Sequence, residues 1–261
     1  SNLRVQNMPD IFFESHRPTD EGTRMSKLQQ RLDSLRPSIM LDIACGSGGG
    51  AAWLQSQFES PRVPIICADV TDRGFRSGAE ALSTPRTLPL LSDAQRMALR
   101  TGCVDLISVV NSLHHFFDPE AAIAEMRRMA MPGGAVLIAE MHRGVRTEAQ
   151  RTHMLLHHWW ADVDTLMGIS HGKTFSQVEL RRLAEGLGAS ELYAEEQNAE
   201  AADPFAAETR RRLEEACDRY LDRLKQHGGG EELARRGRRL RGRISRSGFS
   251  PAPRLVILAI I

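Results

Sequence analysis

A glycine-rich stretch near the start of the chain has the spacing that points most directly to ligand binding. Gly46 and Gly48 follow a short apolar run at 40–45, and Ala51 completes the pattern G-x-G-x-x-G/A. Glycines after a strand let the backbone approach a ligand closely, and a following helix points free N–H groups at it. Asp42 would repel a pyrophosphate but could orient a loop that holds a cationic ligand. The stretch predicts a strand, a ligand-binding turn and the start of a helix.

Polar residues also follow two later apolar runs. Asp69 ends the run at 63–69, 23 residues beyond Gly46, the interval at which a doubly wound fold places a carboxylate for ribose hydroxyls. Asn111 follows a near-continuous apolar run at 104–110, which is typical of the centre of a parallel sheet. We therefore interpret Asp69 as a ribose acceptor, although a turn or cap residue would show the same pattern.

Several histidines could take a proton, because imidazole titrates near neutral pH. They are His115, at the end of a predicted strand, and His153, His157, His158 and His171. A polar surface role is the alternative for each, and we select His115 and His157 as catalytic candidates. His153 and His157 are spaced i, i+4 with Asp164 beyond, which also suits a metal. No Glu follows His153 directly, so the zinc-protease pattern is absent, and we predict no metal site.

The elements that must position these residues follow from the periodicity of the apolar residues. We predict strands at 39–44, 63–69, 84–91, 104–110, 135–140, 189–196 and 254–261. We predict helices at 20–36, 48–58, 118–132, 147–167, 175–188 and 203–228. Pro89 suggests that the strand at 84–91 has an edge position or an irregular end. Strands that alternate with helices indicate an α/β fold.

The stretch Leu-Asp-Ile-Ala-Cys-Gly-Ser-Gly at 41–48 resembles the first motif of class I S-adenosylmethionine-dependent methyltransferases. It is most similar to the ubiquinone/menaquinone-biosynthesis-like small-molecule branch. The resemblance implies a doubly wound, mostly parallel seven-stranded Rossmann-like sheet with helices on both faces. It also implies that a methyl group moves from S-adenosylmethionine to an O, N or C nucleophile of a small organic acceptor. The product of the cofactor would be S-adenosylhomocysteine.

The resemblance further implies a cofactor site at successive strand ends. Asp93, followed by a small residue, would accept a hydrogen bond from the adenine amino group, although Arg-Met-Ala-Leu at 96–99 replaces the usual apolar-Pro-Phe sequence. The candidate cofactor-binding residues are Asp42, Ala44, Cys45, Gly46, Ser47, Gly48, Asp69, Val70, Asp93, Ala94, Asn111 and Ser112.

We divide the chain into an N-terminal cap-helix region at 1–36 and a methyltransferase domain at 37–261. The domain carries a lid segment at 145–175 and a long helical insertion at 197–253, before the last strand. Aromatic walls with a few polar groups suit a small organic acceptor. We therefore expect Trp159, Trp160 and His158 in the lid to line the acceptor pocket, beside His157.

The insertion shows two different patterns. An amphipathic helix begins at Asp203-Pro204, with an apolar face that includes Phe205, Thr209, Leu213, Cys217, Tyr220 and Leu224. We expect this face to form a homodimer contact or to cap the acceptor pocket. The Arg-rich stretch at 235–243 is predicted to be a poorer helix, because each of its two glycines costs about 1 kcal/mol relative to alanine. We expect its arginines to pair with acids rather than to bind RNA.

The overall composition excludes few classes of protein function. A net charge of +1, with 41% hydrophobic and 26% charged residues, is ordinary for a soluble globular protein. No apolar run could span a bilayer, no signal peptide is visible, and the four cysteines are widely spaced. We expect a cytoplasmic protein without membrane or nucleic-acid partners.

Two other functions stay open. A nicotinamide-dependent dehydrogenase would use Gly46, Gly48, Ala51 and Asp69, whereas a nucleic-acid-binding or RNA-modifying protein would use the Arg-rich insertion. Asp42, the Asp93-Ala94 step and the Asn-Ser-Leu-His-His stretch at 111–115 favour the methyltransferase.

Overall fold

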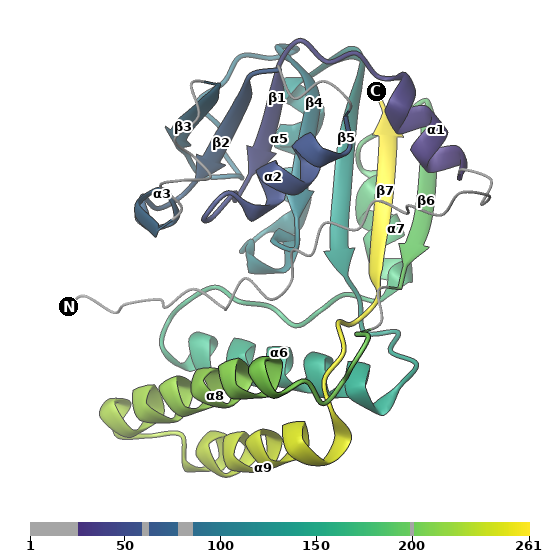
Figure 1. The fold of residues 1–261 in the computed structure, drawn as a ribbon. Helices are drawn as coiled ribbons and strands as arrows, with labels where there is room; N and C mark the ends of the chain where they lie inside the picture. The colour runs from purple at the N-terminus through teal and green to yellow at the C-terminus, as the bar shows by residue number, and fades with distance from the viewer. Residues whose placement is uncertain (1–25, 59–62, 78–85, 199–200) are drawn as a thin grey trace. The chain divides into compact units, whose positions relative to one another are not determined.

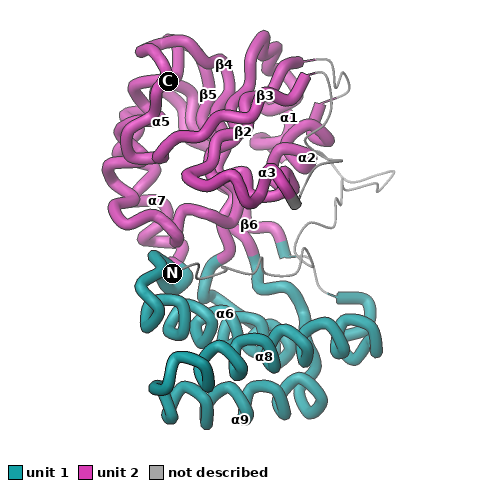
Figure 2. The backbone as a smooth tube through the Cα atoms, turned by 90° about the vertical axis from the view of Figure 1, so that its left-hand side faces the viewer, with its two compact units in different colours: residues 1–14, 142–174, 198–253 teal, residues 15–141, 175–197, 254–261 magenta. Residues whose placement is uncertain are grey.

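The computed structural model describes residues 26–58, 63–77, 86–198 and 201–261 (Figure 1). These residues form two compact units, shown in different colours in Figure 2. The sheet unit holds the described residues up to 141 together with 175–197 and 254–261. The helical unit holds 142–174 and the described part of 198–253.

The described part of the sheet unit contains a seven-stranded sheet with the order β3-β2-β1-β4-β5-β7-β6. Its strands are β1 (Met40–Ile43), β2 (Ile65–Asp69), β3 (Thr87–Leu91), β4 (Val104–Val110), β5 (Ala130–Met141), β6 (Glu191–Gln197) and β7 (Arg254–Ile260). The first five strands run parallel, and β7 pairs antiparallel with both β5 and β6. The predicted doubly wound, mostly parallel sheet is confirmed, with β3 at an edge and β4 at the centre.

The register of the strands places the predicted ligand-binding turns at the same edge of the sheet. Ile43 at the end of β1 pairs with Ala68 of β2 and with Val109 of β4. The strand order reverses between β1 and β4, and such a switch point is where open α/β sheets bind ligands. The residues that follow these three strands therefore meet at one edge of the sheet.

Helices cover both faces of the sheet (Figure 1). They are α1 (Lys27–Ser34), α2 (Gly49–Ser56), α3 (Arg73–Ser77), α5 (Pro119–Met129) and α7 (Gln177–Glu185). α5 and α7 bury Ile123, Met126, Leu180 and Leu183 in one core cluster with the strands. The predicted helix at 20–36 is confirmed over Lys27–Ser34, and its first residues, 20–25, lie outside the described part of the chain.

Capping residues position several helices as their sequence signals predict. The Asp118 carboxylate accepts the Ala121 N–H at 2.9 Å, with Pro119 in the first helical position. Thr147 and Ser176 each form a complete capping box, at the starts of α6 (Glu148–Leu166) and α7. These contacts satisfy N–H groups that have no partner inside the helix.

Strand β5 begins earlier than the predicted 135–140. Ala130, directly after α5, is already extended, and the Pro-Gly-Gly stretch at 132–134 lies within the strand. Gly133 has a φ of +78°, and its N–H donates to the Ile261 carbonyl at 2.7 Å. The register of the β4–β5 pairing shifts between Val104 and Leu106, so the glycines form an irregularity in the strand instead of a separate turn.

The helical unit is built from α6, α8 (Ala207–His227) and α9 (Glu231–Ser247), whose apolar side chains share one core. α8 begins at Ala207, not at Asp203, because the Asp203 carboxylate accepts the Phe205 N–H at 2.8 Å in a local turn. Its apolar residues Leu213, Cys217, Tyr220 and Leu224 are buried inside this unit, whereas Phe205 is exposed. Leu166, near the end of α6, is also exposed.

The Arg-rich stretch, which is predicted to be a poorer helix, lies inside the 17-residue helix α9. Gly237 in α9 lies against the indole ring of Trp159, where a Cβ atom would sit 2.2 Å from the ring carbon Cζ2. Its low helix propensity is therefore offset by the close approach of α6 and α9. None of the helices among the described residues has the length and apolar content of a membrane span.

Candidate active site

The turn after β1 has the backbone that a close-approaching ligand requires. Gly46 and Gly48 have φ angles of +53° and +93°, and Gly48 is the residue before the first turn of α2. A Cβ atom added to Gly46 would meet no atom within 4 Å, so its left-handed conformation, and not crowding, favours glycine there. The turn and the start of α2 therefore present backbone N–H groups at the sheet edge.

Backbone strain is concentrated at the same edge. Among the described residues, Ala44 (φ +56°) and Asn111 (φ +47°) are the non-glycine positions with positive φ, and they follow the adjacent strands β1 and β4. The Asn111 side-chain oxygen accepts the Met141 N–H at 3.2 Å. The Ser112 hydroxyl lies 3.2 Å from the Ala44 carbonyl, to which it can donate. Such strain costs on the order of 1–3 kcal/mol per residue and is typical of ligand sites.

Asp42 supports the glycine turn from inside the sheet unit. Its carboxylate is 1% exposed and accepts the Ser108 hydroxyl at 2.6 Å. A Cβ atom on Gly50 would lie 2.9 Å from Oδ2, so the glycine lets α2 start directly above this carboxylate. Burial raises the pKa of Asp42 to about 7, and the hydrogen bond from Ser108 opposes that rise.

The raised pKa of Asp42 makes stability depend on pH. The folded protein keeps a proton that the unfolded chain releases near pH 4, so the stabilisation is complete below that pH and is lost as pH rises through about 7. We expect the free energy of unfolding of Asp42→Asn, minus that of the wild type, to increase from pH 5 to pH 7. The increase should approach about 1.4 kcal/mol per pH unit. Urea denaturation at a series of pH values measures it.

Asp72→Asn is the matched control for this prediction. Asp72 is exposed, and its hydrogen bond with Arg76 holds its pKa below the ordinary value, outside this window. Its difference from the wild type should stay flat from pH 5 to pH 7. Burial lowers the pKa of His153 to about 3, so its titration makes the protein more stable as pH rises. Because each variant is compared with the wild type at the same pH, this contribution of His153 cancels. A flat difference for Asp42→Asn would show that Asp42 titrates normally.

Asp69 ends β2 beside the glycine turn, as the spacing predicted. Its Oδ2 accepts the Gly46 N–H at 3.0 Å, and its Oδ1 accepts the Thr71 N–H at 2.9 Å. α3 also reaches the turn, because a Cβ atom on Gly74 would lie 2.0 Å from the Gly46 carbonyl oxygen. The acid therefore holds the turn in place and is only partly buried.

The remaining candidate cofactor residues lie at the ends of β2 and β3. Val70 is 67% exposed, which leaves its side chain available to the face of a bound ring. Asp93 is exposed and accepts the Gln95 N–H at 2.9 Å, while Ala94 is buried. Cys45 is buried, and Ser47 is partly exposed within the glycine turn. The residues present thus fit a nucleoside with a cationic tail, although their binding role stays a prediction.

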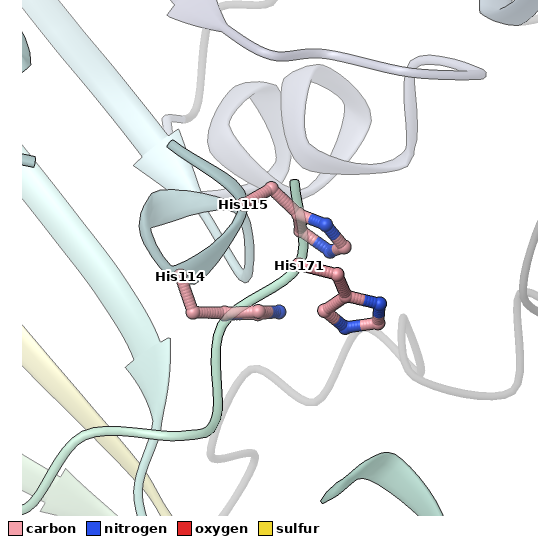
Figure 3. A group of neighbouring side chains, drawn as sticks. All are labelled: His114, His115 and His171. Carbon is pink, nitrogen blue, oxygen red and sulfur yellow. The ribbon is translucent and has the colours of Figure 1, made fainter. Parts of the chain in front are cut away.

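The two histidines after β4 differ in their surroundings. His114 and His115 lie on a short 3₁₀ turn, η1 (Leu113–His115), and their ring centroids are 4.4 Å apart (Figure 3). His114 is buried, and its Nδ1 lies 2.7 Å from Oε1 of the buried Glu140. His115, the predicted catalytic residue, is partly exposed. Sequence reasoning missed His114 and Glu140, although an acid inside the apolar run of β5 was a usable signal.

The lid residues predicted to line a pocket belong largely to the core of the helical unit. Trp159 is fully buried, and its Nε1–H donates to the Leu233 carbonyl at 2.9 Å. Trp160 is also fully buried, and its ring lies 5.9 Å from that of Tyr220. Trp159 therefore belongs to the core of this unit, because its ring is buried and its indole N–H is hydrogen-bonded. His158 Nε2 lies 2.8 Å from the Thr174 hydroxyl.

His157 belongs to a buried polar network inside the helical unit. Its Nε2 lies 3.4 Å from Nε2 of His171, whose Nδ1 donates to Asp164 at 2.8 Å. Asp164 also accepts the Tyr220 hydroxyl at 3.1 Å and pairs with Arg223 at 2.9 Å. Burial would raise the pKa of Asp164, but hydrogen bonding to His171 and the charge of Arg223 hold it below the ordinary value. The network places an ionised carboxylate among imidazoles, and a catalytic role of His157 stays a prediction.

Several arginines of α9 pair with acids, as predicted. Arg241 contacts Asp218 at 2.8 Å, while Arg236 contacts Asp162 and Arg243 contacts Glu148. These pairs place carboxylates from α6 and α8 beside the Arg-rich stretch. They disfavour the nucleic-acid reading, which needs arginines directed at phosphates.

Comparison with known proteins finds methyltransferases among those that the chain resembles. Residues 41–138 match the family model described as "Methyltransferase domain". Over 113 residues the chain is 30% identical to the ubiquinone/menaquinone biosynthesis C-methyltransferase UbiE of Burkholderia vietnamiensis, covering 42% of this chain and 46% of the relative. It is 27% identical over 136 residues to norajmaline N-methyltransferase of Rauvolfia serpentina, covering 51% and 46%. The chain thus spans about half the length of the curated relatives it matches.

Solved structures share the fold. The YcgJ protein of Bacillus subtilis aligns with a TM-score of 0.53 at 14% identity, covering 89% of this chain and 95% of that one. A phosphoethanolamine N-methyltransferase of Haemonchus contortus, solved with S-adenosylhomocysteine, aligns with a TM-score of 0.52 at 16% identity, covering 88% and 50%. Over residues 41–138 the chain is therefore similar to the methyltransferase domain of class I, UbiE-like enzymes, which use S-adenosylmethionine.

Proposed function

We propose that the protein transfers the methyl group of S-adenosylmethionine to a small organic acceptor. One observation supports this proposal most directly. The Gly46 N–H of the glycine turn donates a hydrogen bond to the carboxylate of Asp69 at the end of β2. When bound, the cofactor supplies a methyl group that its sulfonium has already activated. The protein has then to align the acceptor and receive its proton.

The residues proposed to hold the cofactor have distinct tasks. Asp69 would accept the ribose hydroxyls, and Asp93 would accept the adenine amino group. The glycine turn and the start of α2 would bind the amino-acid end, with Asn111 and Ser112 beside them. Each of these residues lies at the carboxyl ends of β1, β2, β3 and β4, which is where the doubly wound fold binds ligands.

Two relatives suggest chemical classes for the acceptor. One is a C-methyltransferase of quinone biosynthesis and the other an N-methyltransferase. We therefore propose a quinol-like ring or a secondary amine as the acceptor. The lid at 145–175 and the insertion at 197–253 would select it, with His158 and Trp160 as candidate contacts. A cytoplasmic location is part of the same proposal.

A homodimer through α8 has little support in the structure. The apolar face that the sequence offered for a dimer contact, including Leu213, Tyr220 and Leu224, is buried in the core of the helical unit. A dimer would have to use another surface, and the oligomeric state stays open to measurement by light scattering.

The proposed function is tested first by binding and then by turnover. Calorimetric titration with S-adenosylhomocysteine should show binding, and titration with NAD should show none. Release of S-adenosylhomocysteine is then measured with hydroquinone and with a simple secondary amine as probe acceptors. Absence of S-adenosylhomocysteine binding would end the methyltransferase proposal, whereas binding of NAD alone would favour the dehydrogenase.

A further inference from the structure

Arg254, the first residue of β7, is a partly buried cation with few partners. Its Nη2–H donates to Oε1 of Gln197 at 3.0 Å, and its guanidinium carbon lies 5.0 Å from the centroid of the Trp53 ring. All three residues belong to the sheet unit. Within the described part of the chain, Arg254 forms no ion pair with a carboxylate. Most N–H donors of its guanidinium are therefore left for other partners.

The donors that remain are open to a ligand. Nε and Nη1 of Arg254 have no hydrogen-bond partner among the described residues, and neither nitrogen is buried. A carboxylate binds a guanidinium best through two parallel N–H···O bonds. The side chain thus keeps enough accessible N–H groups to bind one carboxylate in this way.

The surroundings of the guanidinium favour an anionic ligand. Burial lowers the pKa of Arg254, and the charge of Glu140 opposes that shift. A partly buried charge without a bonded counter-ion is costly, and a carboxylate would compensate the charge and the free donors together. Gln197 and the Trp53 ring already hold the guanidinium, so little side-chain freedom is lost when a ligand binds.

The strand order indicates which ligand could reach this arginine. Arg254 lies opposite Met141, the last residue of β5, and is therefore at the carboxyl edge of the sheet (Figure 1). The candidate cofactor residues follow β1, β2, β3 and β4, and β5 separates β4 from β7. Arg254 is thus at the same edge but beyond the end of that row. An acceptor has to lie beside the cofactor to receive its methyl group, so this position suits the acceptor.

We propose that Arg254 binds a carboxylate of the methyl acceptor and thereby selects acidic acceptors. The inference rests on the proposed function and narrows it to a quinol-like ring or a secondary amine that also bears a carboxylate. The carboxylate takes no part in the transfer itself. Its oxygens accept N–H groups of Arg254, and this contact orients the nucleophile toward the methyl group.

Two matched pairs of probes test the preference for a carboxylate. Gentisate, the carboxylate of hydroquinone, is compared with hydroquinone, and proline is compared with pyrrolidine, by calorimetric titration at saturating S-adenosylhomocysteine. In at least one pair the wild type should bind the acid about 10- to 150-fold more tightly, as expected for charge-assisted hydrogen bonds. Arg254→Gln should reduce that ratio to about threefold or less. Arg254→Lys keeps the charge but not the planar fork, so it should retain part of the preference.

The carboxylate of the cofactor has the same chemistry, and cofactor binding separates the two sources. In Arg254→Gln the dissociation constant of S-adenosylhomocysteine should stay within about threefold of the wild type. The inference is wrong if this variant loses about tenfold or more in S-adenosylhomocysteine affinity but binds methylthioadenosine, which lacks the amino-acid end, as the wild type does. That result would assign Arg254 to the cofactor.

Arg127→Gln is the matched control, because it removes an exposed arginine from α5 in the same unit. It should change neither the ratios nor the cofactor affinity. Equal binding of acid and neutral probe by the wild type, or a preference that survives in Arg254→Gln, would overturn the inference. If Arg254→Gln fails to fold, Arg254→Lys decides, since an unchanged preference in that variant would exclude bidentate binding. Failure of the wild type to bind S-adenosylhomocysteine would count against the proposed function alone, and the same titrations without it would still show whether Arg254 binds a carboxylate.

Discussion

Replacing Asp69 with alanine is expected to weaken S-adenosylhomocysteine binding by about 10- to 150-fold. Hydrogen bonds to a charged group contribute roughly 1.5–3 kcal/mol, which corresponds to that range of affinity. In the free protein the same carboxylate accepts the Gly46 N–H, so alanine also frees the glycine turn. Calorimetric titration measures the loss directly.

Two further variants separate the causes. Asp69→Asn keeps a side-chain oxygen for the Gly46 N–H but removes the charge, so it should recover only the part of the affinity that comes from the turn. Asp72→Ala removes an exposed acid three residues away and should leave the affinity unchanged. If Asp69→Ala bound S-adenosylhomocysteine as the wild type does, Asp69 would have no place in the site.

Replacing Gly237 with alanine is expected to lower the free energy of unfolding of the helical unit by roughly 1–3 kcal/mol, or more. The added Cβ would lie 2.2 Å from Cζ2 of Trp159, a ring that is fully buried and held by its hydrogen bond to Leu233. Such a ring has little room to move aside. Urea denaturation followed by tryptophan fluorescence measures the change, since Trp159 and Trp160 report on this unit.

Gly242, in the same helix, is a matched control. A Cβ atom there would meet the tip of the Arg246 side chain at 2.9 Å, and that tip can rotate away. Gly242→Ala should therefore increase stability by about 0.5–1 kcal/mol, as expected from helix propensity alone. Equal effects of the two substitutions would mean that Trp159 does not restrict α9 at Gly237.

Gly237 and Gly242 show a feature of the fold that the sequence could not predict. From the sequence both glycines weaken a helix, and like charges crowd around them, so the sequence predicts a poorer helix there. The structure stabilises α9 through contacts distant in sequence, including the Arg236–Asp162 pair and the fit of Gly237 against Trp159. Tertiary packing of this kind overrides intrinsic propensity, and a local pattern does not contain it.

The helix starts and the glycine turn were predicted correctly because the residues that form them lie close together in the sequence. The Asp118-Pro119 start of α5 and the capping boxes at Thr147 and Ser176 involve residues within one helical turn. The glycine turn and Asp69 followed from a spacing that one βαβ unit determines. The His114–Glu140 pair needed the register of two neighbouring strands, because 26 residues separate its members. The indoles of Trp159 and Trp160 suited either a pocket or a core, and their spacing alone did not decide between them.

The antiparallel position of β7 also bears on the order in which the chain can fold. Among the described strands β6 pairs with β7, and Gln197 lies opposite Arg254, with α8 and α9 between them in the sequence. During synthesis β6 therefore emerges well before its partner, and an unpaired edge strand is prone to join another chain. The acidic residues of β6, Glu191, Glu195 and Glu196, oppose such association by charge repulsion while β6 waits. A chain with a two-residue turn in place of α8 and α9 would form the same pairing as a local hairpin, which closes faster than a long-range contact.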